Sequence, residues 1–344
     1  MNAQLVRKTA GLIVGLSIAI PLILLMFIGP SSRGTPHDLP IGVVGPQAAV
    51  TQMSAALEQK QPGAFEVHAY ASAEDLQRAT RDRDVYGGLV LGPQPQTIIA
   101  TGASPVVAGT LTQIGQQAAQ RTGATPELVD VAPAAQDDPR GAGFGSVVMP
   151  VFIAGAALGI ALTQVVRRGT LIALLLPVAA ALIGAAVVGA AMLVGVLPGG
   201  FWAQWLAMSG GILAIGSAVA GLVSLIGMAG VGIAAMFFMI VGMPLSGIAS
   251  PPEFLPGIWG TVGQWLPLGA TGTALRDAAF FADGSLIGPG AGAAFGVIVL
   301  WIAIGYALLG ASMLKRRMLQ NELLGDGVVV EPDGEERELV PAAG

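Results

Sequence analysis

Cysteine is absent from this chain, which excludes disulfides, thiol nucleophiles and thiolate metal sites together. Histidine is scarce: only His37 and His68 occur, and neither has a second His or Cys at ligand spacing, so a transition-metal site would need carboxylates alone. No lysine follows a glycine, so the G-x-x-x-x-G-K loop that cradles ATP phosphates is missing. We therefore expect no cofactor and no metal, and any ATP would be hydrolysed by a partner.

Charge is also scarce. Only 11% of the residues are charged, against roughly 25% in ordinary soluble domains, while 53% are hydrophobic and the mean hydropathy is +0.73. The formal net charge is -5, and the acidic surplus lies largely near the C-terminus, so no basic surface suggests nucleic acid. A chain of this composition needs lipid as its solvent.

The first apolar run follows Arg7 and Lys8 and extends from Thr9 to Ile28, about the 20 residues that a helix needs to cross hydrocarbon. We assign residues 1–30 to the N-terminus and a first transmembrane helix. A cleaved signal peptide is the alternative, but its apolar core is normally shorter, about 7 to 15 residues, and no A-x-A pattern follows closely.

Residues 31–146 mix charged, polar and apolar residues with turn formers, as is typical of a domain that folds in water. Short β-branched or apolar runs alternate there with helical patterns, which predicts a small α/β domain. The predicted strands are Ile41–Val44, Phe65–His68, Val85–Leu91, Thr97–Ala100 and Leu128–Val131, and the predicted helices are Ala48–Gln59, Ala73–Arg81 and Val106–Arg121.

Residues 147–314 are almost free of charge, and the few charges fall where the apolar runs break. These breaks predict five more spans, with a turn needed at Gly227 to Gly230 because one continuous run there would be too long for a single crossing. The predicted spans are Val148–Val166, Leu171–Leu197, Trp205–Ile226, Val231–Ile248 and Ile287–Leu314. The expected fold is a membrane all-α bundle of six transmembrane helices with an extracytoplasmic α/β domain inserted after the first.

Positive charges of the short loops predict the orientation, since cytoplasmic loops are enriched in Lys and Arg. Arg7 with Lys8, Arg167 with Arg168, and residues 315–317 all fall on one side of a six-span arrangement. We expect that side to be the cytoplasm, which places both termini inside a plasma (inner) membrane. The acidic stretch after them predicts a disordered cytoplasmic tail over residues 315–344.

Small residues at four-residue spacing, such as Gly155 with Gly159 and Gly292 with Gly296, predict close approach between helices. The middles of the spans carry no ionisable residue, which disfavours a proton-coupled carrier, and the membrane half offers Ser and Thr without any His, which disfavours nucleophilic catalysis. We therefore expect no enzyme.

The most distinctive segment is residues 242–281, in which several prolines interrupt an apolar sequence. We predict two short half-helices, a re-entrant hairpin near residues 249–285 that packs against spans, because irregular backbone survives at membrane depth only inside protein or around a wet cavity. The candidate residues of this hairpin or exit gate are Pro252, Glu253, Pro256, Pro267, Arg276 and Asp277. Arg276 and Asp277 are interpreted as an interfacial ion pair at the helix start, or alternatively as gatekeepers of an exit path.

This layout and the segment PLSGIASPPEFLPGIWGTVGQWLPLGATGTALRD, residues 244–277, resemble ABC-2 type transporter permeases, particularly the YhgE/Pip phage-infection proteins and the type VII secretion protein EsaA. LPIGVVGP at residues 39–46 and VYGGLVLGP at residues 85–93 are similar to the opening of the outside domain in that group. The resemblance implies a homodimer or heterodimer that moves a lipid, peptide or drug outward through the membrane, powered by a separate ATP-binding subunit.

Two functions remain open. An export permease would use Arg167 and Arg168 as a coupling loop to its ATPase, although these residues also serve as a simple topology signal. A non-transporting envelope scaffold or receptor would use the outside domain to bind partners. The short inner connection at residues 166–170 favours the second function, whereas the closely packable spans and the hairpin favour the first.

Overall fold

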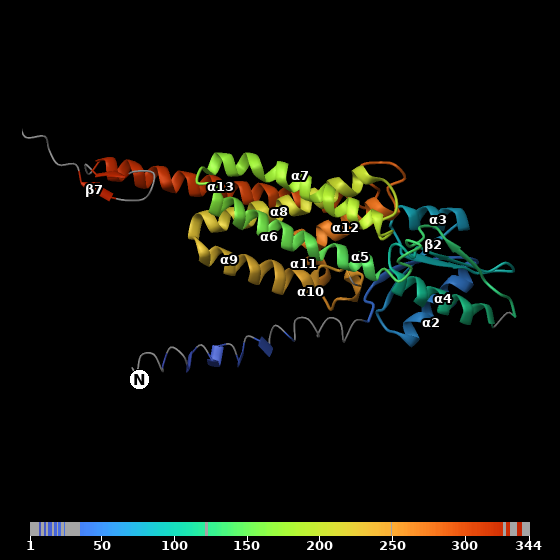
Figure 1. The fold of residues 1–344 in the computed structure, drawn as a ribbon. Coiled ribbons are helices and arrows are strands. Elements are labelled where there is room, and N and C mark those ends of the chain that lie inside the picture. Colours follow the sequence, from blue (N-terminus) through green and yellow to red (C-terminus); the bar gives the residue numbers. More distant parts are fainter. Residues whose placement is uncertain are drawn as a thin grey trace, which may run out of the picture.

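The computed structural model of this protein describes residues 35–325 except 121, 122 and 249, together with 328–330, 336–338 and isolated positions between 7 and 24. The predicted first membrane helix, within residues 1–30, therefore lies largely outside the described residues. The described part is mostly helical, with a small mixed sheet at one end of a helical bundle (Figure 1).

The sheet has five strands in the order β2-β1-β3-β4-β5. Its strands are β1 Leu39–Val44, β2 Phe65–Tyr70, β3 Gly87–Val90, β4 Gln96–Ile99 and β5 Glu127–Asp130. β1 pairs in parallel with β2 and β3, β3 pairs antiparallel with β4, and β4 pairs in parallel with β5. Every predicted strand of this region has its counterpart in the sheet.

Three helices cover the two faces of the sheet: α2 Gln47–Lys60, α3 Ala73–Arg81 and α4 Pro105–Gln120. Successive residues of a strand point to opposite faces. Leu39 and Ile41 accordingly pack with residues of α2 and α4, whereas Val44 packs with Leu76 of α3. α3 begins at a capping Ser72, whose hydroxyl accepts a hydrogen bond from the Asp75 backbone N–H at 3.1 Å. The three predicted helices are thus confirmed.

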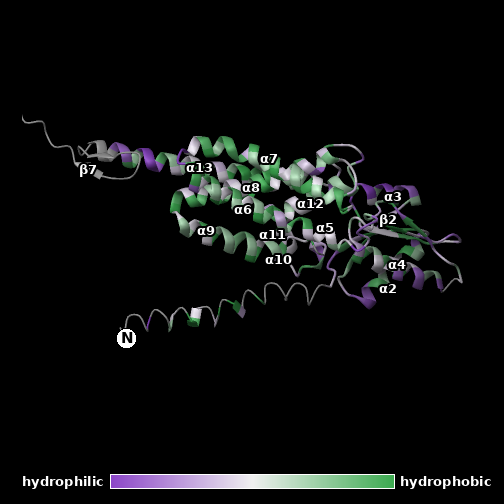
Figure 2. Cartoon of the chain, in the orientation of Figure 1, coloured by the Kyte–Doolittle hydropathy of each residue, from purple (hydrophilic) through white to green (hydrophobic). Residues whose placement is uncertain are grey.

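Five helical runs of the described part are long and apolar enough to cross a membrane. They are residues 142–165, formed by α5 Ala142–Val147 and α6 Met149–Val165; α7 Gly169–Leu193; α8 Phe201–Ile226; residues 228–245, formed by α9 Met228–Ala235, a π-helical segment Met236–Gly242 and α10 Met243–Leu245; and α13 Gly292–Gly325. The chain is therefore a membrane protein. The apolar residues concentrate in the bundle and the polar residues in the sheet region (Figure 2).

α8 is the central helix of the bundle, with contacts to α6, α7, α9 and α13. Its neighbours approach closely through small residues. A Cβ on Gly155 or Gly159 of α6 would collide with atoms of α8, at 2.8 and 2.6 Å, in agreement with the close approach that the four-residue spacing predicts. Gly292 and Gly296 of α13 make no such close approach to the described residues, none of which lies within 4 Å of a Cβ at either position.

The ends of the helices correct the predicted boundaries. The turn predicted after α8 is confirmed and consists of Gly227 alone, which has a φ of 65° that favours glycine. The first described span begins at residue 142, inside the region assigned to the soluble domain. α13 continues to Gly325, so residues 315–325 are helical rather than disordered, because this stretch is rich in the helix formers Lys, Arg, Gln, Glu and Leu.

Between the fourth and fifth membrane-length runs the chain forms three short elements: a 3₁₀ turn at Pro252–Phe254, α11 Trp259–Gln264 and α12 Pro267–Phe280. α12 packs on α8 and α13, and Gly211 of α8 lies so close that a Cβ would collide with the Thr271 side chain. The indole N–H of Trp301 in α13 donates to the Trp265 carbonyl at the break between α11 and α12, at 2.9 Å. The interrupted backbone is thus held by a neighbouring helix.

Candidate functional site

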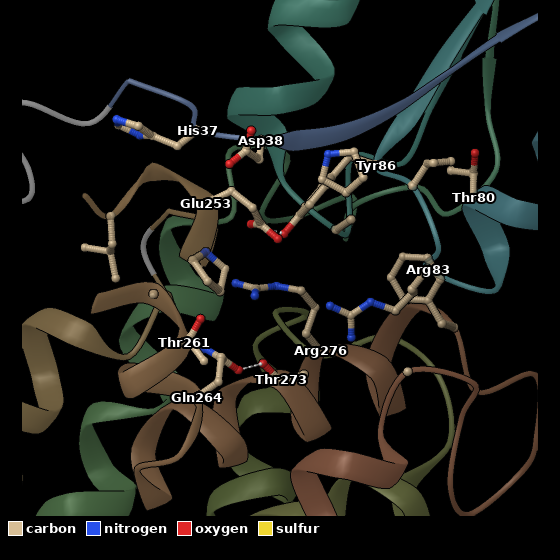
Figure 3. Close-up of a pocket in the computed structure, with 18 of the residues that line it drawn as sticks. His37, Asp38, Thr80, Arg83, Tyr86, Glu253, Thr261, Gln264, Thr273 and Arg276 are labelled. Carbon is tan, nitrogen blue, oxygen red and sulfur yellow. Dashed lines mark hydrogen bonds between the residues drawn. The ribbon is translucent and has the colours of Figure 1, made fainter. Parts of the chain in front are cut away.

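A cavity of about 620 Å³ lies where the sheet region meets the α11–α12 hairpin. One wall comes from the start of β1 and from residues 80–86, which end α3 and connect it to β3. The other wall comes from the 3₁₀ turn, α11, α12 and the loop before α13. Figure 3 shows labelled polar side chains from both walls around this space, including Asp38, Tyr86, Glu253 and Arg276.

Tyr86 and Glu253 connect the two walls directly. The Tyr86 hydroxyl donates a hydrogen bond of 2.8 Å to Glu253 Oε2, and the backbone N–H of His37 donates to the Glu253 carbonyl at 2.8 Å. Burial, together with the nearby Glu253 carboxylate, raises the pKa of Tyr86 far above its ordinary value. The Tyr86 hydroxyl therefore stays protonated and remains a donor to the carboxylate.

Arg276 lies on α12, which is not one of the five membrane-length helices. Its Nη2 donates to the Ile248 carbonyl at 2.8 Å, and its Cζ lies 4.9 Å from the centre of the Phe144 ring. Burial and the positive charge of Arg83 lower the pKa of Arg276 to about 10. The guanidinium therefore keeps its charge at neutral pH.

Arg83 reaches the hairpin from the end of α3. Its Nη1 lies 3.6 Å from Oδ1 of Asp277, whose side chain is 0% exposed, and its Cζ lies 5.4 Å from the centre of the Phe281 ring. Asp277 also accepts the backbone N–H of Gly290 at 3.2 Å. Burial raises the pKa of Asp277, and Arg83 and the Gly290 N–H counteract part of that shift.

Polar groups of α11 and α12 complete the floor of the cavity. Thr273 donates to Gln264 Oε1 at 2.6 Å, and Gln264 Nε2 donates to the Ser246 carbonyl at 3.1 Å. Thr261 lies on the same side of the cavity, below Arg276 in Figure 3. The hairpin thus presents an ordered polar surface toward the sheet.

Apolar contacts anchor the hairpin to the sheet region on both sides of the cavity. Phe254, from the 3₁₀ turn, is 9% exposed and packs into the cluster of Leu39, Ile41 and residues of α2 and α4. Phe281, after α12, packs with Ala100, Ala103 and Ala132. The walls of the cavity are therefore fixed relative to one another by two hydrophobic contacts, an ion pair and the hydrogen bonds of Glu253.

The structure places the predicted hairpin residues as follows. Pro252, Glu253 and Arg276 line the cavity, and Pro256 is exposed just before α11. Pro267 is buried at the first residue of α12, a position that tolerates a missing N–H.

The expected ion pair of Arg276 with Asp277 is corrected. Neighbouring residues of a helix point in different directions, so Asp277 pairs with Arg83 while Arg276 faces the cavity. Arg167 and Arg168 are exposed between α6 and α7, at the end of the bundle away from the sheet (Figure 1).

Sequence reasoning missed Arg83 and Tyr86. Arg83 belongs to the run RDRD at residues 81–84, where nothing in the sequence separates a cavity residue from an exposed charge. Among the described residues there is no group of three or more His, Asp or Glu that could hold a metal ion.

The chain matches no protein-family model, and no curated protein and no solved structure matches it significantly.

Proposed function

We propose that this chain is the membrane-spanning permease subunit of an ABC-2 type exporter, which moves a lipid-like, peptide or drug substrate outward and is powered by a separate ATPase. The observation that carries the proposal is the interrupted α11–α12 hairpin, which packs on α8 and α13 directly beneath a polar cavity. Irregular backbone inside a membrane bundle is tolerated where it is buried in protein or lines a wet space. Such a segment is costly in a purely structural bundle and useful at a substrate path.

In this proposal the cavity is the outer end of the path, and the opposite end of the bundle meets the ATPase. Arg167 and Arg168 would form the coupling loop, and the basic residues 315–317 of α13 lie at the same end (Figure 1). This arrangement agrees with a cytoplasmic location of that end in a plasma membrane, with both termini inside. A homodimer or heterodimer of such subunits would enclose the path.

One observation favours a second function, a non-transporting envelope scaffold or receptor whose sheet region binds partners. The connection between α6 and α7 consists of residues 166–168 alone, which leaves no room for a helix that could dock on an ATPase. Coupling would then need another contact, or would not exist.

The test is purification of the tagged chain from native membranes in a gentle detergent, with identification and stoichiometry of the proteins that accompany it. We expect an ATP-binding subunit at near-equal amount, lost when Arg167 and Arg168 are both changed to Gln. The matched control is Arg316→Gln with Arg317→Gln, which removes two exposed charges at the same end of the bundle and should leave the partner bound.

A chain purified without an ATPase, or with envelope proteins that depend on residues 35–140, would contradict the exporter and establish the scaffold or receptor. Loss of the partner from both double variants would show that net charge, not the loop, holds the ATPase.

A further inference from the structure

Two guanidinium groups line the cavity, and their hydrogen-bonding capacity is largely unused by the described residues. Arg83 Nη1 is buried without a hydrogen-bond partner there, since Asp277 Oδ1 lies 3.6 Å away, within ion-pair distance but beyond hydrogen-bond distance. Asp277 Oδ2 is also buried without a hydrogen-bond partner among the described residues. The structure gives the Arg276 guanidinium a hydrogen bond to the Ile248 carbonyl, and a guanidinium carries five N–H donors. Buried donors without acceptors are uncommon and point to a missing partner.

The way in which the two arginines are held supports the same conclusion. Each guanidinium lies over an aromatic ring, Arg276 over Phe144 and Arg83 over Phe281. An aromatic face supports a guanidinium without using its N–H groups, which point outward along the edge of the plane. The donors are thus fixed in position before any ligand arrives, which lowers the entropic cost of binding.

Three carboxylates line or adjoin the cavity, those of Asp38, Glu253 and Asp277, and in the described part of the chain none of them forms an ion pair with Arg276. Asp277 is buried beside Arg83 and accepts the Gly290 N–H, and Glu253 accepts the Tyr86 hydroxyl. Among the described residues Glu253 forms no ion pair within 4 Å with Arg83 or Arg276. Arg276 therefore faces the cavity without a carboxylate of its own.

We propose that this cavity binds a phosphate group of the transported molecule through the guanidinium groups of Arg276 and Arg83. Planar guanidinium donors match the geometry of a phosphate. The proposal rests on the proposed function in that it names the chemical class of the cargo. The test measures binding to the purified chain alone. The phosphate-binding proposal can therefore fail even if an ATPase partner is found, and it can hold even if no ATPase is found.

The experiment titrates the full chain, purified in the uncharged detergent dodecyl maltoside, with dodecyl phosphate and follows binding by thermophoresis. Inorganic phosphate and dodecyltrimethylammonium are titrated in parallel. We expect saturable binding of dodecyl phosphate and none of the cationic amphiphile. If dodecyl phosphate binds and inorganic phosphate does not, the bound anion belongs to an amphiphile. If the two bind equally well, the site recognises a soluble oxyanion.

The variants separate the site from general surface charge. Arg276→Gln should weaken dodecyl phosphate binding by about tenfold or more, the effect of losing a charged hydrogen bond. Arg83→Gln combined with Asp277→Asn, which leaves the local net charge unchanged, should weaken binding severalfold. The control is Arg81→Gln. Arg81 is an exposed arginine at the last residue of α3, two residues before Arg83, and this variant should bind dodecyl phosphate as the natural chain does. Glu253→Gln removes a negative charge from the wall and should tighten binding.

Folding of each variant is checked by its melting temperature in the same detergent. If Arg276→Gln does not fold, Arg276→Lys takes its place, because it keeps the charge but loses the planar fork, and a severalfold loss is expected. Unchanged binding by the Arg276 variant, equal binding of dodecyltrimethylammonium, or no binding of either phosphate probe would overturn the proposal.

Discussion

Arg83 has a backbone conformation that residues other than glycine rarely adopt, with a φ of 64° just after the end of α3. Helices often end with glycine at such a position, and another residue there costs about 1–2 kcal/mol. The conformation directs the Arg83 side chain to Asp277, whose carboxylate is fully buried. A local backbone cost is thus offset by a contact between segments far apart in the sequence.

Replacing Arg83 by a neutral residue leaves the buried Asp277 carboxylate without its ion-pair partner. We expect Arg83→Gln to destabilise the chain by about 2 kcal/mol, less than a fully buried pair because the Arg83 side chain is 17% exposed. Asp277→Asn in the same chain should restore most of that loss, because no buried charge then lacks a partner. The measurement is the free energy of unfolding of the natural chain, both single variants and the double variant. Additive losses would show that the two residues do not interact.

At the scale of elements, the hairpin depends on backbone segments that approach without side chains between them. Gly263 of α11 lies so close to Leu245 that a Cβ would collide with the Leu245 carbonyl oxygen, and a Cβ on Gly269 of α12 would collide with the Gly263 carbonyl oxygen. A backbone oxygen cannot rotate away as a flexible side chain can. The spacing between α10, α11 and α12 is therefore set by glycine.

Gly263→Ala should lower the melting temperature and speed hydrogen exchange in α11 and α12, because the helices must move apart to accommodate the methyl group. The matched control is Gly189→Ala in α7, where no atom of the described residues lies within 4 Å of the added Cβ. There alanine should be neutral or stabilising, since it is the better helix former by about 1 kcal/mol. Equal effects of the two substitutions would contradict the close-packing account of the hairpin.

At the scale of the molecule, the sheet region and the helical bundle are joined through the hairpin and not only through the chain connection at α5. Phe254 belongs to the hairpin segment by sequence but packs in the apolar cluster between the sheet, α2 and α4. Phe281 and the Arg83–Asp277 pair add contacts on the other side of the cavity. A motion of the hairpin would therefore be transmitted to the sheet region.

Phe254→Ala removes a large side chain from that cluster and should destabilise the contact by about 3 kcal/mol or more. We expect faster hydrogen exchange in β1 and α4 as well as in residues 250–262. Phe237→Ala is the control, because Phe237 is 38% exposed and packs against Phe238 and Trp301 within the bundle, away from the sheet. Unchanged exchange in β1 and α4 of the Phe254 variant would show that the two parts do not depend on one another.

Local sequence predicted much of the secondary structure. Membrane-length helices follow from runs of apolar residues, and the strands and helices of residues 39–130 follow from short β-branched runs between turn formers. The predictions failed where the local signal was ambiguous. Residues 315–325 are charged and polar, as disordered tails are, but they are also good helix formers and continue α13.

The sequence by itself determined that this protein is built for lipid, because hydropathy is a sum over neighbouring residues and needs no knowledge of the fold. It also located the interrupted segment, since prolines mark breaks wherever they occur. Only the tertiary structure decided that Asp277 pairs with Arg83 and that Arg276 faces a cavity shared with Tyr86 and Glu253. These contacts join segments far apart in the chain, and their geometry depends on packing distances that no local window of sequence contains.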